Sequence, residues 1–129
     1  MAEKAVVRTE QAPAPFQGAP YSQAIRAGDL VFVSGQLALE PGSHEIVGET
    51  IEEQTELVFR NLRAILEEAG SSLGRIVKTT VYLTDLANFQ GMNEVYRAQV
   101  GDTPPARATL EVSALPSGAL VEIEAVALV

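Results

Sequence analysis

The sequence contains no cysteine and one histidine, His44. The absence of cysteine excludes disulfide bonds, thiolate metal sites and a cysteine nucleophile. A single histidine excludes a metal site built from several histidines of one chain. His44 follows a Pro41-Gly42 turn, where we expect a solvated side chain. We therefore expect no metal site.

Basic residues are also scarce, with 9 Lys and Arg against 17 Asp and Glu and a formal net charge of −8. Nucleic acids and anionic membrane surfaces are bound by clustered Lys and Arg, so we expect neither as a partner. No apolar run approaches the roughly 18 residues of a membrane span. The opening MAEKAVVRTEQ lacks the apolar core of a signal peptide, and the cytoplasm is the expected location.

The 129 residues are 47% hydrophobic and 20% charged, the composition of an ordinary folded domain. This length suffices for one hydrophobic core and is short for two. The chain shows no internal repeat, no low-complexity segment and no linker. It therefore predicts a single domain over residues 1–129.

Two stretches carry the apolar stripe of an amphipathic helix. In residues 51–69 apolar side chains recur at three- and four-residue spacing, and Thr50 with Glu53 forms a capping-box pattern at the start. A shorter stripe over residues 86–100 predicts a second helix, which Asp85 is placed to cap.

Apolar or alternating stretches predict the strands, at residues 4–8, 29–34, 45–47, 76–84, 107–112 and 121–128. Two helices of this size cover only one face of a sheet, which predicts an α+β fold with both helices on one face of a single sheet. The other face would then carry Phe32, Tyr82, Val126 and Leu128. We expect a second copy of the chain to cover these side chains.

The stretch PPARATLEVSALPSGALVEIE, residues 104–124, carries the candidate chemistry. Arg107 presents a planar fork that matches a carboxylate in two hydrogen bonds, and an ionised glutamate, Glu122 or Glu124, is a plausible general base. Tyr21 and Ser34 are further candidates. We expect the cation and a carboxylate on the concealed face of the sheet, near a subunit boundary. A purely structural ion pair between Arg107 and a strand glutamate is the open alternative.

The run PPARATLEVSALPSGALVEIEAVAL resembles the C-terminal signature of the RidA (YjgF) family of enamine/imine deaminases, which joins a P-A-R segment to an E-I-E-A segment at fixed spacing. Further stretches match in order: APYSQA at 19–24, VFVSGQLAL at 31–39 and NLRAILEEAGSSLGRIVKTTVYLTDLANFQGMNEVY at 61–96. The resemblance covers essentially the whole chain. It implies a single mixed sheet of the chorismate-mutase type, a relative of the ferredoxin-like fold, in homotrimers whose pockets lie between adjacent subunits.

The resemblance also implies roles for individual residues. Arg107 would bind the substrate carboxylate, and Glu124, the second glutamate of E-I-E, would activate the attacking water. The implied substrate-binding positions are Tyr21, Ser34, Gly35 (through its backbone), Asn93, Arg107 and Thr109. Thr109 stands where many members carry a cysteine, so regulation through a thiol is excluded here.

The reaction implied by the resemblance is hydrolysis of a short 2-imino acid, such as 2-iminobutanoate or 2-iminopropanoate, or of the tautomer 2-aminoacrylate, to a 2-keto acid and ammonia. Positioning and one general base suffice for it, so we expect no cofactor. Two alternatives stay open. The same pocket could bind 2-keto acids without turnover, or the protein could act on RNA, which the net charge of −8 disfavours.

Overall fold

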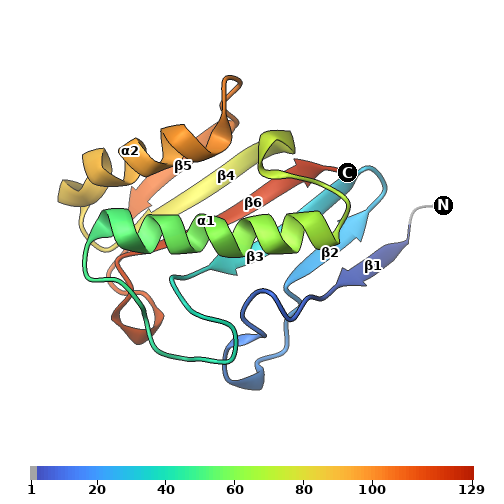
Figure 1. Ribbon diagram of the computed structural model, residues 1–129, viewed down its shortest axis with the longest axis horizontal. Helices are drawn as coiled ribbons and strands as arrows, with labels where there is room; N and C mark the ends of the chain where they lie inside the picture. Colours follow the sequence, from blue (N-terminus) through green and yellow to red (C-terminus); the bar gives the residue numbers. More distant parts are fainter. Residues whose placement is uncertain (1–2) are drawn as a thin grey trace.

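The computed structural model describes residues 3–129 as one six-stranded sheet with two α-helices. The elements in chain order are β1 Lys4–Val7, β2 Ala24–Ala27, β3 Leu30–Gln36, α1 Ile51–Glu68, β4 Ile76–Leu83, α2 Phe89–Val100, β5 Ala106–Glu111 and β6 Val121–Leu128 (Figure 1). The strand order is β1-β2-β3-β6-β4-β5, and only the β4–β5 pair is parallel. The sheet is therefore mixed, as predicted.

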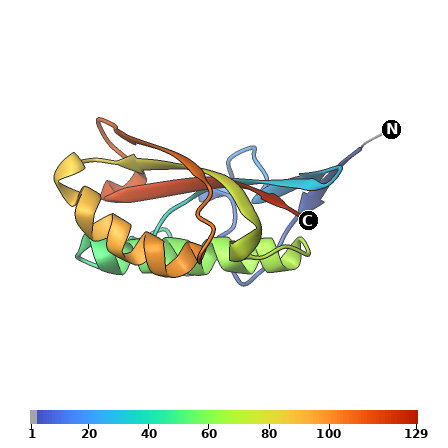
Figure 2. The same ribbon diagram turned by 90° about the horizontal axis from the view of Figure 1, so that it is seen from above.

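Both helices lie on the same side of the sheet, which Figure 2 shows from above. Val58 and Leu62 of α1 and Met92 of α2 are fully buried against this side, where Val81 of β4 and Ile123 of β6 are also fully buried. Burial of this kind stabilises each side chain by about 1.5–3 kcal/mol. The predicted α+β architecture is thus confirmed.

The first helix begins and ends close to the predicted positions. Glu53 N donates to Thr50 Oγ1 at 3.1 Å and Thr50 N donates to Glu53 Oε1 at 3.2 Å, which completes the predicted capping box. The last helical residue is Glu68, and Gly70 follows with a φ of 82°, a left-handed conformation that glycine adopts without strain.

The second helix begins later than predicted. Asp85 Oδ1 accepts a hydrogen bond from Ala87 N at 2.8 Å, but the turn it caps is a 3₁₀ helix, Leu86–Asn88, and α2 starts at Phe89. A 3₁₀ turn has about 3.0 residues per turn, so Leu86 leaves the apolar stripe. Its side chain is 47% exposed, and its assignment to the buried face was wrong.

The helices approach closely where α2 carries Gly91. A Cβ atom at this position would lie 2.6 Å from Ile51 Cγ2, inside the contact distance of two carbon atoms. Glycine in a helix costs about 1 kcal/mol relative to alanine. The close packing of α2 on α1 leaves no room for a Cβ atom at Gly91, which explains why the helix contains glycine there in spite of that cost.

The strand predictions need two corrections. The four residues of β2, Ala24–Ala27, were not predicted, because so short a segment shows no periodicity. The strand expected at residues 45–47 is reduced to one bridge between Leu39 and Ile46. The turn Pro116–Gly118 connects strands that are not neighbours, since β4 lies between β5 and β6.

The sheet face away from the helices is not covered by any other element of residues 3–129 (Figure 2). Phe32 and Leu128 are 45% and 41% exposed on this open face, and Tyr82 and Val126 are partly exposed. All four side chains were predicted there. Neither helix of the described residues is both long enough and apolar enough to cross a membrane.

Candidate functional site

The register of the sheet separates the candidate cation from the candidate carboxylates. Arg107 of β5 lies opposite Thr79 of β4, whereas Glu124 of β6 lies opposite Thr80 of β4. Consecutive residues of a strand point to opposite faces, so Arg107 lies on the helix-covered face and Glu124 on the open face. The prediction that a cation and a carboxylate of one chain share the concealed face is therefore wrong.

The error has a definite physical origin. Alternation along a strand assigns side chains to two faces within that strand, but the relation between two strands depends on their register. Here β5 and β6 are related through β4, which lies between them and pairs parallel with one and antiparallel with the other. This register is not visible in the local sequence of either strand.

The side chains that contact Arg107 are neutral, and a second cation, Arg97 of α2, lines a cavity beside it. Arg107 Nη1 donates to Asn93 Oδ1 at 2.8 Å, and its Cζ lies 4.7 Å from the ring centroid of Tyr96 and 5.5 Å from that of Phe89. All three partners belong to α2. Among residues 3–129 no carboxylate pairs with Arg107, which removes the alternative of a structural ion pair within the chain.

A cavity of about 290 Å³ opens beside this arginine, between α2 and the segment that leads into β5. Asn93, Tyr96, Pro104 and Arg107 are among the residues that line it. Its size is close to the lower end of the range for small-molecule sites, about 300–1,000 Å³. An unpaired guanidinium at the wall of such a cavity is suited to binding a small carboxylate.

Thr109 lies two residues along β5, on the same face as Arg107. Its Oγ1 is buried and has no hydrogen-bond partner within residues 3–129. A buried unpaired hydroxyl lowers stability, because its desolvation is not compensated. The structure thus places three predicted substrate-binding residues, Asn93, Arg107 and Thr109, at one edge of the molecule.

The carboxylates lie on the open face beside a bulge in β3. The pairing of β3 with β6 shifts between Val33 and Gln36, which leaves Ser34 and Gly35 in the bulge. A Cβ atom at Gly35 would overlap Glu122 Oε2, so a larger residue at this position would displace the end of the Glu122 side chain. Gly35 thus lies in the bulge, and the side chain nearest to it is that of Glu122.

The two glutamates of the open face differ in their surroundings. Burial raises the pKa of Glu122, and the nearby Glu124 carboxylate raises it further. Glu124 Oε1 instead accepts a hydrogen bond from the Tyr82 hydroxyl at 2.8 Å. That hydrogen bond, with burial and the charges of Glu124 and Glu122, raises the pKa of Tyr82. The pKa of Glu122 is therefore shifted upward, toward neutral pH.

Tyr21 and Ser34 lie at the same end of the sheet as the bulge. Ser34 Oγ donates to Ser22 O at 2.6 Å, and the Tyr21 hydroxyl accepts from Phe16 N at 2.6 Å. Tyr21 and Gly35 also line one small cavity. Tyr21, Ser34 and Gly35 thus gather with Glu122, away from Arg107.

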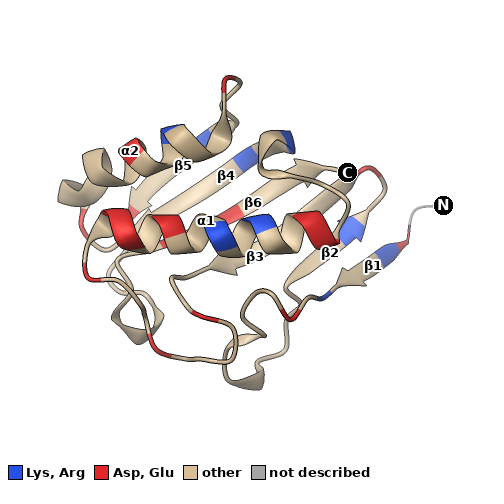
Figure 3. Ribbon diagram, viewed as in Figure 1, with Lys and Arg blue, Asp and Glu red and all other residues tan. Residues whose placement is uncertain are grey.

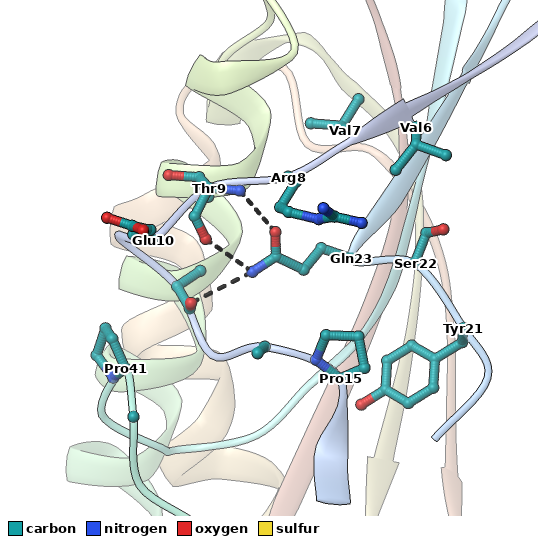
Figure 4. Close-up of a pocket in the computed structure, with 13 residues that line it drawn as sticks. Val6, Val7, Arg8, Thr9, Glu10, Pro15, Tyr21, Ser22, Gln23 and Pro41 are labelled. Carbon is teal, nitrogen blue, oxygen red and sulfur yellow. Dashed lines mark hydrogen bonds between the residues drawn. The ribbon is translucent and has the colours of Figure 1, made fainter. Parts of the chain in front are cut away.

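Gln23 holds the leading segment in place, and sequence reasoning missed it. Its side chain is 3% exposed; Nε2 donates to the carbonyls of Thr9, Ala12 and Pro13, and Oε1 accepts from Thr9 N at 2.7 Å. Figure 4 shows the contacts with Thr9 and Ala12 beside a cavity of about 300 Å³ that Tyr21 also lines. One glutamine in a proline-rich stretch gave no periodic signal that could have marked it.

The charges are not arranged for a polyanion or a metal. Lys and Arg are distributed over several elements and do not gather on one (Figure 3). Within the described part of the chain, no three His, Asp or Glu side chains are grouped so that they could hold a metal ion.

Comparison with known proteins yields consistent matches over nearly the full length. The family model described as Endoribonuclease L-PSP matches residues 9–129. The chain is 52% identical to a RutC family protein of Pyrococcus abyssi over 96% of both sequences. It is 47% identical to Reactive Intermediate Deaminase A, chloroplastic, of Arabidopsis thaliana, over 97% of this chain and 66% of that protein.

Solved structures agree with the fold. RidA from the Antarctic bacterium Psychrobacter matches with a TM-score of 0.91 and 42% identity, over 97% of this chain and 99% of that one. TdcF of E. coli with bound serine matches with a TM-score of 0.88 and 37% identity, over 97% and 98% of the two chains.

The unpaired hydroxyl of Thr109 generates a stability prediction. Thr109→Val keeps the side-chain shape and removes the hydroxyl, so we expect the free energy of unfolding to stay unchanged or rise by up to about 1 kcal/mol. Urea unfolding measures this change. The matched control is Thr55→Val, because the Thr55 hydroxyl donates to Ile51 O at 2.7 Å in the wild type. We expect this control to lower the free energy of unfolding by about 1 kcal/mol. An equal decrease for Thr109→Val would show that its hydroxyl is paired after all.

Proposed function

The chain belongs to the Endoribonuclease L-PSP family, which includes the RidA proteins, and we propose that it is an imine deaminase. It hydrolyses short 2-imino acids, such as 2-iminobutanoate and 2-iminopropanoate, or their enamine tautomers such as 2-aminoacrylate, to 2-keto acids and ammonia. The observation that supports this most is Arg107, a cation without a carboxylate partner among residues 3–129, at the wall of a small cavity. The relative named Reactive Intermediate Deaminase A supports the same activity.

We further propose that two copies of the chain build each site within a homotrimer. One copy contributes Arg107, Asn93 and Thr109 from the β5 edge. The neighbouring copy contributes Glu122 with Tyr21, Ser34 and Gly35 from its open face. The separation of these groups in one chain and the exposed apolar side chains of the open face support this assembly.

In the proposed reaction Arg107 binds the substrate carboxylate in its fork and so orients the imine carbon. A glutamate takes a proton from water as the oxygen attacks that carbon. The glutamate returns this proton to the nitrogen of the carbinolamine. It then takes the proton of the carbinolamine hydroxyl as the C–N bond breaks, so that the carbonyl forms and ammonia leaves. The chain needs no resident cofactor for these steps.

For the general base, the geometry favours a different glutamate from the one that the sequence predicted. Glu124 was predicted to be the base, but its carboxylate accepts a hydrogen bond from the Tyr82 hydroxyl. Glu122 contacts the Gly35 backbone, and its raised pKa suits a group that both takes and returns a proton near neutral pH. We therefore assign the base to Glu122, with Glu124 as the second candidate.

Two other functions are distinguishable by experiment. E. coli TdcF was solved with bound serine, so a related protein can hold a small molecule. A binding or sensing role would give affinity for 2-keto acids without turnover. The family description names an endoribonuclease, but the net charge of −8 and the scattered basic residues disfavour RNA as substrate. Cleavage of RNA by the protein, lost in Arg107→Ala, would favour that reading.

Removal of the carboxylate anchor tests the deaminase proposal. A dehydratase acting on serine or threonine generates the imine, semicarbazide traps what is not hydrolysed, and the release of keto acid is measured. We expect Arg107→Ala to slow hydrolysis by about 100-fold or more, because two charge-assisted hydrogen bonds are lost. Arg107→Lys should recover only part of the rate, since an ammonium binds one oxygen at a time.

The control Arg26→Ala, at an exposed position of β2, should match the wild type. Wild-type activity in Arg107→Ala would refute the anchor role.

The pH dependence of hydrolysis separates the two glutamates. A general base acts when deprotonated, so activity falls as the pH drops below the pKa of Glu122. The charge of Glu124 contributes to raising that pKa. Glu124→Gln should therefore keep activity and move the acidic limb of the pH–rate profile to lower pH, whereas Glu122→Gln should abolish hydrolysis. The reverse pattern, loss in Glu124→Gln and retention in Glu122→Gln, would assign the base to Glu124.

A further inference from the structure

Two aromatic rings of α2 hold the Arg107 guanidinium. Its Cζ lies 4.7 Å from the ring centroid of Tyr96 and 5.5 Å from that of Phe89, both within the range of cation–π contacts. Its Nη1 donates to Asn93 Oδ1 at 2.8 Å. Two rings and one amide thus hold this cation in place, and no carboxylate of residues 3–129 forms an ion pair with it.

The Tyr96 ring is itself fixed from two directions. Its hydroxyl lies 2.6 Å from Thr79 Oγ1, and Thr79 is fully buried on β4 directly opposite Arg107. The ring packs edge-on against Phe59 of α1, with centroids 5.5 Å apart and an angle of 81° between the planes. Tyr96 is 5% exposed, so it cannot reorient without breaking both contacts.

Tyr96 stays a neutral phenol at the pH of most cells. Burial raises its pKa, and the hydrogen bond with Thr79 and the charge of Arg107 act in the opposite direction with smaller effect. The ring therefore attracts the guanidinium through its π face and does not form an ion pair with it.

This mode of contact leaves the arginine available to a ligand. Rings contact the flat face of a guanidinium, whereas a carboxylate binds the N–H donors in its plane. Apart from the bond to Asn93, the in-plane donors have no hydrogen-bond partner within residues 3–129. An arginine side chain that is already held in one orientation also loses less conformational entropy when it binds.

We propose that Tyr96 is a positioning residue for carboxylate recognition. Anchored by Thr79 and packed against Phe59, it holds the guanidinium plane of Arg107, together with the ring of Phe89, in the orientation that receives the substrate carboxylate. The inference rests on the proposed role of Arg107 as carboxylate anchor. Tyr96 acts through Arg107 and takes no part in the proton transfers.

Substitutions that keep or remove the ring test this role. The measured quantities are the dissociation constant of 2-oxobutanoate, by calorimetry, and the KM and kcat of imine hydrolysis. Tyr96→Leu removes the ring, and we expect it to weaken 2-oxobutanoate binding by about 5- to 30-fold and to raise KM more than it lowers kcat. Tyr96→Phe keeps the ring and should stay within about 3-fold of the wild type.

Two further variants guard against a purely structural effect. Val95→Ala truncates a buried side chain next to Tyr96 in the chain and should lower Tm without changing the affinity for 2-oxobutanoate. Phe89→Leu, at a partly buried position, removes the second ring and should weaken binding by about 2- to 5-fold even where Tyr96→Leu does not fold.

The outcomes are separable from those of the proposed function. Wild-type affinity in Tyr96→Leu, or an equal loss of affinity in Val95→Ala, would overturn the positioning role. A wild-type protein that binds 2-oxobutanoate but hydrolyses no imine would overturn the deaminase proposal, while a ring-dependent affinity would still support the role of Tyr96. A wild-type protein that binds no 2-oxobutanoate and hydrolyses no imine would overturn both.

Discussion

The register of three strands is the constraint on which the proposed site depends. Because β4 pairs with β5 on one side and β6 on the other, Arg107 and the two open-face glutamates point to opposite sides of the sheet. No rotation of side chains brings them together, since the sheet itself lies between them. The proposed chemistry, which uses both a cation and a base, would therefore take them from two copies of the chain.

Each half of the site shows an electrostatic arrangement that is incomplete by itself. The β5 edge holds a cation among neutral rings and an amide, and the open face holds two carboxylates of which Glu122 has a raised pKa. A neighbouring cation favours the ionised form of a carboxylate, so Arg107 from another copy would oppose the rise in the Glu122 pKa that burial and Glu124 cause. Substrate carboxylate and catalytic glutamate would then compete for the same guanidinium.

Much of the fold and part of the site could be predicted from the sequence, for identifiable reasons. The stripe of α1, its capping box at Thr50 and its end near Gly70 are encoded within a few turns of the chain, and the apolar open face follows from strand alternation. The relation between Arg107 and Glu124 is encoded across three strands and could not be predicted. The distinction between Glu122 and Glu124 depends on a bulge in a different strand, β3. Tyr96 looked like an ordinary member of an apolar stripe, because its contacts with Thr79 and Arg107 exist only in the folded chain.

Complementation between inactive variants tests the two-copy site most directly. Arg107→Ala and Glu122→Gln, each inactive alone, are mixed in equal amounts, unfolded and reassembled, and imine hydrolysis is compared with that of wild-type protein treated in the same way. If each site takes Arg107 from one copy and Glu122 from the next, random reassembly restores about a quarter of the wild-type activity, because only that fraction of sites receives both intact halves. If one copy supplies both residues, every site keeps a defect. A reassembled mixture as inactive as its two components would contradict a site shared between subunits.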